Sequence, residues 1–393
     1  MTRRKFFFTT AAAQARIFGA NDRIRVGIIG PGGRGKYLMG VFKEFGADLG
    51  AVCDVYQANL EAGLKLATPG AERYKDYRKL LENKSLDAVI VSTPDHWHAQ
   101  MAIDAVHAGK DVYVEKPMAH KIEEGFAMID AVRQTKRVLQ VGTQRRSAEM
   151  FLEGKRIMES GQLGEVHLVT SDWRNYSGNL RGNAKLQGEL DWKQWQGSAP
   201  KHDLDPARYF NWYYYFDYSG GLITGQAAHI VDCIQWYMKS NGPLAVTCSG
   251  LKPDLPGVEV TNTATMVMEF PENYLATFTL GYKSMPYNQA NDQIKQFHGT
   301  QARFDVGREC YYLWPKSSDV DMKASVSRKE PGSFGRAAPS HVHNFLECIR
   351  SRKDPNAPVE AGQATNIVLC MAMQSLREGR RLKWNAKERK VDA

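Results

Sequence analysis

A glycine-rich turn near the start of the chain has the spacing of a nucleotide-binding loop. The β-rich run Arg25–Ile29 leads into Gly30-Pro31-Gly32-Gly33-Arg34-Gly35 and then into an amphipathic helix, which is G-x-G-x-x-G between strand and helix. Gly30 permits the tight turn, Gly32 lets the backbone approach a diphosphate, and Gly35 allows close packing of the helix. Because the N-terminus of such a helix attracts an anion, Gly33 and Arg34 are expected to lie beside a dinucleotide diphosphate.

An acidic residue stands where a dinucleotide-binding fold needs one. Asp54 ends the second β-rich run, about twenty residues after the loop. Its carboxylate is expected to bind the adenosine ribose diol and to repel a 2′-phosphate, so NAD is favoured over NADP. Arg34 could still reach such a phosphate, and NADP therefore stays possible.

Two further segments carry titratable side chains at the ends of expected strands. Thr93-Pro94 with His98 follows one β-rich run, and Glu115-Lys116-Pro117 follows the next. The carboxyl ends of parallel strands form the edge where open α/β sheets bind ligands. A residue before proline is held out of helical geometry, so the Lys116 ammonium can be aimed across that edge. There it could polarise a hydroxyl whose proton leaves as a hydride is transferred, although a solvated lysine in a turn is the alternative.

Aromatic side chains suggest a place for a sugar. Trp173, with Arg174 beside it, and the segment Tyr209–Tyr213 could offer flat faces to pyranose rings. The alternative for these residues is the packed core of a long loop.

Two histidine pairs, His96 with His98 and His341 with His343, have a spacing that could hold a metal ion. No cysteine or carboxylate clusters beside either pair, so no metal site is predicted. His341 and His343 are instead expected to begin a helix.

The elements that must position these residues alternate between strand and helix in the first part of the chain. Short, unalternating apolar runs are typical of strands buried on both faces of a parallel sheet. Five such runs are expected, at residues 24–29, 49–53, 86–92, 111–114 and 138–141. Helical spacing of apolar residues between them predicts a doubly wound α/β domain.

The pattern changes after about Ser147. A helix at 150–159 and a strand at 166–173 lead into a long aromatic and glycine-rich excursion at 175–218, followed by a helix at 224–239. Successive strands are then expected at 245–251, 261–270, 274–282, 294–298, 302–306 and 310–314, with closing helices at 341–351 and 361–377. The prediction is an α/β chain whose second domain contains an open, largely antiparallel sheet.

Composition restricts the partners. The 393 residues hold 52 Lys and Arg against 43 Asp and Glu, and the basic residues are scattered. A nucleic-acid-binding surface would concentrate them in a stripe, so no nucleic-acid partner is predicted. No stretch approaches the length of a membrane span, and no membrane segment is expected.

The first twenty residues form a separate unit. Thr2-Arg3-Arg4-Lys5-Phe6-Phe7 and the Ala/Thr/Phe run after it resemble a twin-arginine signal, although Arg16 interrupts the apolar stretch. Residues 1–20 therefore predict export to the periplasm, and the alternative is a basic N-terminus on a cytoplasmic protein.

Taken together, the motifs resemble those of the Gfo/Idh/MocA oxidoreductases, named for glucose-fructose oxidoreductase and inositol dehydrogenase. The glycine loop, Thr93-Pro94 with His98, and Glu115-Lys116-Pro117 carry the likeness, and Gly220-Gly221 with His229 and Asp232 extends it. The resemblance implies a Rossmann domain at 21–145 and a C-terminal substrate and oligomerisation domain at 146–393. It also implies NAD or NADP as hydride carrier, sugar or cyclitol substrates, and homodimers or homotetramers.

By position, Lys116 and His229 match the catalytic residues of that family, and Asp232 is expected to bind substrate or to have a structural role. The chain departs from the family at Gly225, where an aspartate is usual four residues before the histidine. On a helix both positions share a face, so a carboxylate is missing from the expected site.

The gap at Gly225 and the family resemblance together leave three functions open. Lys116 and His229 could suffice for oxidation of a sugar or of a larger glycoside. Alternatively, the chain could cleave glycosides by transient oxidation with a tightly bound, recycled NAD. It could also bind the cofactor without ordinary turnover.

Overall fold

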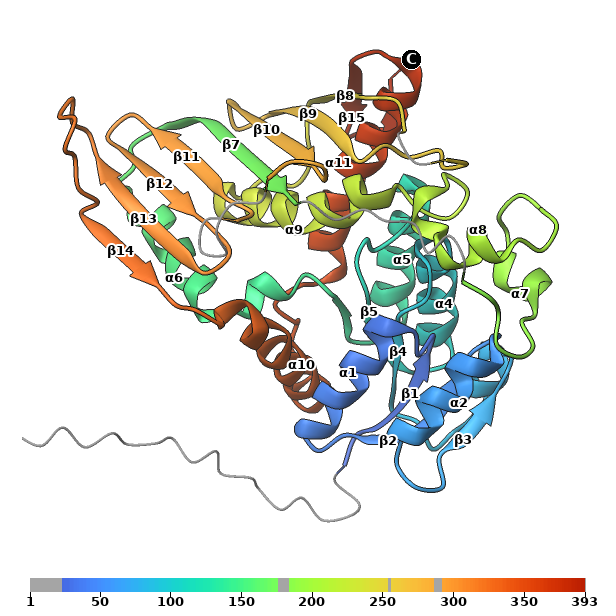
Figure 1. Cartoon of the computed structure of the whole chain (residues 1–393). Coiled ribbons are helices and arrows are strands. Elements are labelled where there is room, and N and C mark those ends of the chain that lie inside the picture. Colours follow the sequence, from blue (N-terminus) through green and yellow to red (C-terminus); the bar gives the residue numbers. More distant parts are fainter. Residues whose placement is uncertain (1–22, 176–183, 254–255, 286–291, 393) are drawn as a thin grey trace, which may run out of the picture.

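The computed structural model describes residues 23–175, 184–253, 256–285 and 292–392 (Figure 1). The expected export signal at 1–20 lies outside the described residues. Within these ranges the strands form one six-stranded and one ten-stranded sheet.

The six-stranded sheet is parallel throughout and has the order β3-β2-β1-β4-β5-β6. Its strands are β1 (Arg25–Ile29), β2 (Asp48–Cys53), β3 (Glu72–Tyr74), β4 (Ala88–Val91), β5 (Asp111–Val114) and β6 (Leu139–Val141). The central strands are short and almost wholly buried, as their unbroken apolar runs predict. The prediction of a doubly wound parallel sheet is confirmed.

Helices cover both faces of this sheet. The elements between its strands are α1 (Gly33–Glu44), α2 (Gln57–Leu66), α3 (Tyr77–Leu81), α4 (Asp95–His107) and α5 (Ile122–Thr135). Residues of α3, α4 and α5 share one apolar cluster with the sheet, and residues of α1 and α2 share another on the opposite face. The sequence pattern did not single out β3, because this edge strand is mostly exposed and has no apolar run.

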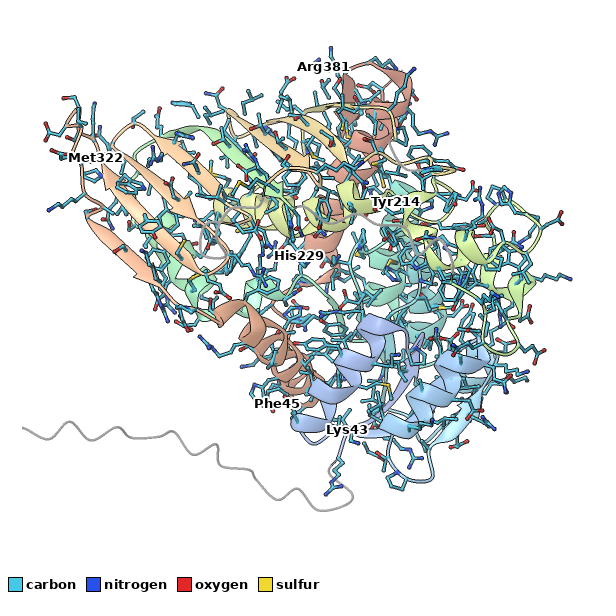
Figure 2. All side chains as sticks on the ribbon, viewed as in Figure 1. Lys43, Phe45, Tyr214, His229, Met322 and Arg381 are labelled. Atoms are coloured by element: carbon cyan, nitrogen blue, oxygen red, sulfur yellow. The ribbon has the colours of Figure 1, made fainter. Side chains whose placement is uncertain are left out.

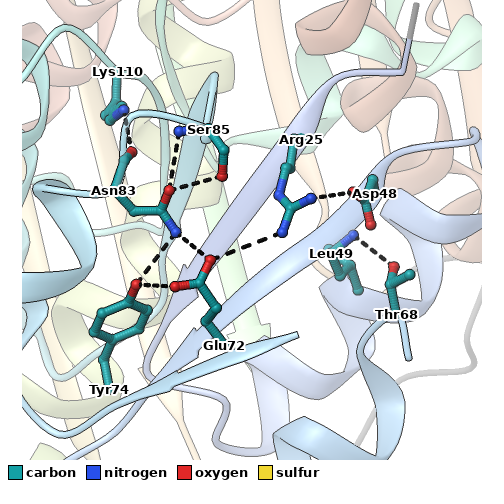
Figure 3. Close-up of polar contacts among 9 residues, drawn as sticks. All are labelled: Arg25, Asp48, Leu49, Thr68, Glu72, Tyr74, Asn83, Ser85 and Lys110. Atoms are coloured by element: carbon teal, nitrogen blue, oxygen red, sulfur yellow. Dashed lines mark hydrogen bonds and ion pairs between the residues drawn. The ribbon is translucent and has the colours of Figure 1, made fainter. Parts of the chain in front are cut away.

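Polar contacts close the amino-terminal edge of the sheet (Figure 3). Arg25, Asp48 and Glu72 begin β1, β2 and β3, and the Arg25 guanidinium lies 3.4 Å from Asp48 and 4.0 Å from Glu72. The Asn83 amide donates to Glu72 at 2.7 Å, and Lys110 Nζ donates to the Asn83 carbonyl at the same distance. The opposite, carboxyl edge is therefore the one left for a ligand.

The ten-stranded sheet has the order β14-β13-β12-β11-β7-β10-β9-β8-β15-β16. Its strands are β7 (Val166–Arg174), β8 (Ala245–Gly250), β9 (Thr263–Phe270), β10 (Tyr274–Gly281), β11 (Lys295–Gly299), β12 (Ala302–Val306), β13 (Cys310–Pro315), β14 (Val326–Lys329), β15 (Leu382–Asn385) and β16 (Lys390–Val391). Neighbouring strands are antiparallel except for the central pair β7 and β10. The largely antiparallel sheet is confirmed.

One face of this sheet packs against helices. The remaining helices are α6 (Glu149–Glu159), α7 (Trp192–Gln196), α8 (Pro206–Phe210), α9 (Gly221–Met238), α10 (Ser333–Ser351) and α11 (Val359–Glu378), with 3₁₀ turns η2 (Gln144–Ser147) and η3 (Trp212–Tyr214). Apolar residues of α6, α9 and α11 form a common core with the strands. Helix α9 lies between this sheet and the six-stranded domain (Figure 1).

Helix α10 corrects one expectation. It begins at Ser333 and contains Pro339, so His341 lies in the middle of the helix and not at its start. The His341 ring is buried, with Nδ1 2.7 Å from Ser147 Oγ and Nε2 2.8 Å from the Val141 carbonyl oxygen. These two contacts, and not a cap, explain a histidine at this position.

Candidate functional site

A cavity of about 700 Å³ runs along the carboxyl edge of the six-stranded sheet and reaches helix α9. Figure 2 shows His229 in the middle of the molecule, between the two sheets. The predicted site residues that line this cavity are Gly30, Gly32, Gly33, Arg34, Asp54, Thr93, Pro94, His98, Glu115, Lys116, Trp173 and His229. The fold therefore brings most of the predicted site together in one cavity.

The glycine loop leaves open space before helix α1. Gly30 has φ +85°, which favours glycine, and it turns the chain from β1 toward the helix. A Cβ added to Gly32 or Gly33 would meet no atom of the described residues within 4 Å, whereas one added to Gly35 would overlap the Gly30 carbonyl oxygen. Gly35 therefore lies behind the cavity, in the contact between helix and loop. The open backbone at Gly32 and Gly33 fits a diphosphate at the helix N-terminus.

Asp54 lies at one end of the cavity. Its Oδ1 accepts a hydrogen bond from the Tyr56 backbone N–H at 2.8 Å, and burial raises the pKa of its carboxyl to about 7. The other predicted discriminating residue, Arg34, is turned elsewhere, because its Nε donates to Glu115 Oε1 at 2.7 Å. Glu115 follows β5, three strands away from β2, so Arg34 points away from the ribose side of the cavity.

Residues 184–218, here called the aromatic insertion, cover the Asp54 end. A β-bridge joins Tyr56 to Leu190, and the Gln57 backbone N–H donates to the Glu189 carbonyl oxygen at 2.9 Å. Trp195 and Tyr209 of the insertion line the cavity. Tyr209 packs on Tyr56 and belongs to a buried apolar cluster that also contains Trp195, so the alternative of a packed loop core is confirmed for Tyr209. Because Trp212 and Tyr213 also line the cavity, a sugar surface at these residues stays a prediction.

His98 ties the two strand-end loops together. Its Nδ1 lies 2.7 Å from the Pro117 carbonyl oxygen and its Nε2 lies 2.9 Å from the Thr93 carbonyl oxygen. The ring is buried, so its contacts fix the distance between the loop after β4 and the loop after β5. Lys116, in the second of these loops, is thereby held at the cavity wall.

Lys116 reaches across the cavity to helix α9. Its Nζ donates to the Gly225 carbonyl oxygen at 2.9 Å. Burial disfavours the ammonium and lowers the pKa of Lys116, while Glu115 and Asp95 oppose the shift. A lysine with a lowered pKa can take up a proton from a substrate hydroxyl.

His229 stands on α9, one turn after Gly225. Burial lowers its pKa well below 6.5, and the nearby cations Lys116 and Arg145 lower it further. Its Nδ1 is buried and has no hydrogen-bond partner in the part of the chain that the structure describes. The ring is therefore neutral and has an unused nitrogen. Trp173 packs against it, with 6.1 Å between the two ring centroids.

Gly225 leaves room beside the lysine. Within the described ranges, and apart from its own helical turn, a Cβ at this position would meet only Lys116 Nζ, at 3.9 Å. The expectation that positions 225 and 229 face the same site is confirmed, because both residues line the cavity. The site thus has a vacancy where a carboxylate side chain would stand.

Two residues predicted to bind substrate do not line the cavity. Asp232 is almost fully buried, and its two carboxylate oxygens share the hydrogen bond that Arg146 Nε donates, at 2.8 and 3.0 Å. Arg174 ends β7 and lies 3.9 Å from Asp172. The structure gives Asp232 a place in a buried ion pair, which was the structural alternative.

Sequence reasoning missed several residues of the site. Tyr56, Gln144, Gln194 and Phe334 all line the cavity. None lies in a motif, although Gln194 lies within the aromatic segment that the sequence singles out. In the described ranges no group of three or more His, Cys, Asp or Glu could hold a metal ion, and no helix there is long and apolar enough to cross a membrane.

Comparison with known families gives matches over both parts of the chain. Residues 24–143 match the family described as "Oxidoreductase family, NAD-binding Rossmann fold", and residues 155–384 match "Oxidoreductase family, C-terminal alpha/beta domain". The N-terminal domain is thus an NAD-binding Rossmann domain.

Curated relatives match over shorter stretches. An alpha-N-acetylgalactosaminidase of Shewanella oneidensis is 33% identical over 216 residues, and the match covers 48% of this chain and 44% of that protein. A glycosyl hydrolase family 109 protein of Shewanella baltica is 38% identical over 125 residues, 30% of this chain and 27% of that protein. The matched segment therefore spans less than half the length of these relatives.

Solved structures share the fold over most of the chain. The WlbA dehydrogenase of Bordetella pertussis, in complex with NADH and UDP-GlcNAcA, has a TM-score of 0.70 at 21% identity, over 93% of this chain and 100% of that one. A levoglucosan dehydrogenase in complex with NADH and levoglucosan has a TM-score of 0.72 at 18% identity, over 92% and 99%. The scyllo-inositol dehydrogenase of Lactobacillus casei has a TM-score of 0.68 at 20% identity, over 92% and 98%.

Proposed function

Because the chain belongs to the Gfo/Idh/MocA family of oxidoreductases, we propose that it transfers a hydride between NAD and a hydroxyl-bearing carbon of a sugar, glycoside or cyclitol. One observation supports this most directly. A single cavity contains the open glycine loop and Asp54 at one end and Lys116 with His229 at the other. The dinucleotide-binding residues and the proton-handling residues thus share one cavity.

The roles of the residues follow from their positions. Gly32 and Gly33 would hold the diphosphate, and Asp54 the adenosine ribose. Bound NAD supplies the hydride acceptor. Lys116 Nζ hydrogen-bonds the reacting hydroxyl and takes up its proton as the carbonyl forms. His229, neutral and with a free ring nitrogen, orients a second hydroxyl or passes the proton on.

Replacement of Lys116 tests this role. Lys116→Met keeps the length of the side chain and removes the proton acceptor, so turnover is expected to fall by about a hundredfold to ten-thousandfold. Calorimetry is expected to show nearly unchanged NAD affinity, because the diphosphate and ribose sites remain. Lys121→Met, at an exposed lysine beyond this cavity, is the matched control. Equal activity of Lys116→Met and wild type would refute the role.

A second candidate function is supported by the aromatic insertion. Because residues 184–218 cover the Asp54 end of the cavity, a dinucleotide bound there would be hindered from leaving. A retained cofactor suits an enzyme that oxidises a glycoside transiently, eliminates the glycosidic bond and recovers the NAD. Two relatives are named as glycoside-cleaving proteins. Product analysis separates the candidates, because only net oxidation releases NADH in proportion to product.

Cofactor binding without activity on a broad panel of sugars and glycosides would instead favour the third possibility, a catalytically impaired protein. For this reason the first measurement is the NAD(H) content of the purified chain, followed by the activity panel.

We also propose export and self-association. Residues 1–20 would act as a twin-arginine signal, and periplasmic fractionation of the full chain, with Arg3→Lys and Arg4→Lys together as control, tests this. A homodimer or homotetramer is expected from family membership, and sedimentation equilibrium gives the mass that decides it.

A further inference from the structure

The substrate end of the cavity holds a lysine without a carboxylate partner. Lys116 Nζ is hydrogen-bonded to the carbonyl of Gly225 and, in the described part of the chain, forms no ion pair. The carboxylates that line the cavity are otherwise engaged: Asp54 accepts from the Tyr56 backbone at the far end, Asp95 from Ser219 Oγ at 2.6 Å, and Glu115 from Arg34. None of them occupies the side of Lys116 that faces α9.

Two buried cations lie behind this end of the cavity. Arg145 and Lys295 are fully buried and stand 5.4 and 5.2 Å from the centroid of the Phe151 ring. Arg145 donates to the Gln293 side chain, and Lys295 Nζ donates to the Gln293 carbonyl oxygen at 2.7 Å. Both polar partners are neutral.

The carboxylates near Arg145 and Lys295 also lie close to other cations. Asp292 lies 3.9 Å from Arg308, and Asp172 lies 3.9 Å from Arg174. The region behind the cavity therefore keeps an excess of positive charge. The positive charge of Arg145 lies close to the cavity wall, because its guanidinium is 5.7 Å from the centroid of the Trp173 ring. The Trp173 ring in turn packs on His229.

Gly225 provides the space for an anion. Among the described residues beyond its own helical turn, the only atom within 4 Å of a Cβ added at Gly225 would be Lys116 Nζ. The next side chain, Gln226, has its amide nitrogen committed to Tyr282 Oη at 2.6 Å, so it does not fill the space. A negatively charged group of a ligand can stand there, in contact with the lysine and with the surrounding charge in its favour.

We infer that the substrate is an acidic sugar, whose own carboxylate or sulfate ester lies over Gly225 against Lys116. The inference rests on the proposed function and gives it a substrate class. The substrate would thus supply the negative charge that the chain lacks at position 225. Arg145 and Lys295 would favour that charge from behind the wall without touching it.

The titration behaviour of the neighbouring groups agrees with this. After burial, the strongest influences on the pKa of His229 are Lys116, Arg145, Arg34 and Lys295, and every one lowers it. Burial also lowers the pKa of Lys295 to about 7 and that of Arg145 to about 10, so near neutral pH Arg145 carries its full charge and Lys295 carries only part of its charge. A ligand anion beside Lys116 would offset part of this positive potential.

Matched sugars test the inference on the NAD-loaded protein. The probes are methyl glucuronide, methyl glucoside 6-sulfate and methyl glucoside, with methyl galacturonide and methyl galactoside as an epimeric pair. Calorimetry is expected to show that an acidic member of one series binds on the order of tenfold to a hundredfold more tightly than its neutral counterpart. The affinities for methyl glucuronide and for methyl glucoside 6-sulfate show which anion is preferred. Equal affinity of acidic and neutral members, or no binding of any of them, would overturn the inference.

Two isosteric variants locate the anion. Gly225→Asp places a carboxylate beside Lys116 and is expected to remove the preference for the acidic sugar. Gly225→Asn fills the same volume without charge, so it is expected to displace the anion and reduce the preference, but by less than Gly225→Asp, which also pairs with Lys116. Circular dichroism checks that both fold, which the helical backbone and the open space at this position allow. An unchanged ratio in Gly225→Asp would contradict the assignment.

The outcomes separate this inference from the proposed function. If neutral sugars yield NADH and acidic ones bind no better, the oxidoreductase stands and the substrate class is wrong. If acidic sugars bind preferentially and no oxidation or bond cleavage follows, the substrate class stands and the proposed reaction is wrong.

Discussion

Lys116 and His229 both titrate away from their ordinary values, in the same direction and for the same main cause. Burial disfavours the cationic form of each, so both pKa values fall. For Lys116 this raises the fraction of neutral amine near neutral pH, and for His229 it removes protonation as an event near pH 6.5. The two residues therefore have different roles: the Lys116 amine takes up the proton, and the His229 imidazole hydrogen-bonds a second hydroxyl.

A pH profile follows from that division. With a neutral sugar, kcat/KM for oxidation is expected to rise with pH and to level off below 10.5, the ordinary pKa of lysine. The sign is positive because only the unprotonated amine accepts the hydroxyl proton, and a lowered pKa moves the limb to lower pH. With saturating NAD, no limb from His229 is expected near 6.5. A profile that falls with increasing pH would exclude Lys116 as the proton acceptor.

Asp54 sets a second prediction, on the choice of dinucleotide. Its pKa is raised to about 7 by burial, so the carboxylate that repels a 2′-phosphate is present mainly above that pH. The preference for NAD over NADP is expected to increase between about pH 6 and pH 8. Asp54→Asn should abolish this pH dependence and reduce the preference, as measured by the two dissociation constants. Glu61→Gln, an exposed carboxylate on α2, is the control that should keep wild-type values.

The residues of the site were predictable where a motif states a backbone requirement. The glycine loop, Asp54 and Lys116 all lie in the cavity because strand ends of a parallel sheet share one edge. Asp232 was harder, because one turn of spacing from His229 says nothing about Arg146, which pairs with it from a segment 86 residues away. The buried pair Arg145 and Lys295 carried no local signal at all.

At the start of helix α1, two glycines of one motif, Gly32 and Gly35, have different structural roles. A methyl group at Gly35 would overlap the Gly30 carbonyl oxygen, whereas a methyl group at Gly32 would stand in open space. Gly35 thus allows the helix to pack on the loop, and Gly32 keeps the space before the helix free.

Alanine substitutions are expected to separate these two roles. Gly35→Ala should destabilise the protein by about 1–3 kcal/mol, because backbone must move to admit the methyl group. Gly32→Ala should keep the urea midpoint of the wild type and weaken NAD binding about tenfold or more, because the methyl group blocks the diphosphate. Urea unfolding and calorimetry on the same preparations measure both. Equal stability losses in the two variants would contradict the division.

Two features of the elements could not be predicted from sequence patterns: the start of α10 and the pairing of β7 with β10. The sequence pattern predicts a helix that starts at about His341, but α10 begins earlier, at Ser333, and contains Pro339. The parallel pair β7 and β10 joins strands about a hundred residues apart, and no turn signal specifies such a contact. Long-range packing decides both features.

At the scale of the molecule, α10 links the two parts of the chain. It follows the strands of the larger sheet, yet its Val342, Phe345 and Leu346 belong to the apolar cluster of α1, α2 and the parallel sheet. Figure 1 shows α10 beside α1. A division at about residue 145, as the sequence pattern predicts, would therefore leave one face of the Rossmann domain without part of its core.

Loss of that contact gives the last prediction. Phe345 is fully buried, with its ring 5.8 Å from that of Tyr113 and 6.1 Å from that of Phe42. Phe345→Ala is expected to lower the free energy of unfolding by about 3–5 kcal/mol, and to weaken NAD binding if loosening of α1 reaches its N-terminus. Glu347→Ala, an exposed residue of the same helix paired with Arg350, should change it by less than about 1 kcal/mol. Urea unfolding measures the free energy of unfolding of the two variants. If Phe345→Ala lowered it no more than Glu347→Ala, the contact of α10 would contribute little to the stability of the Rossmann domain. Residues 23–145 would then be expected to fold alone.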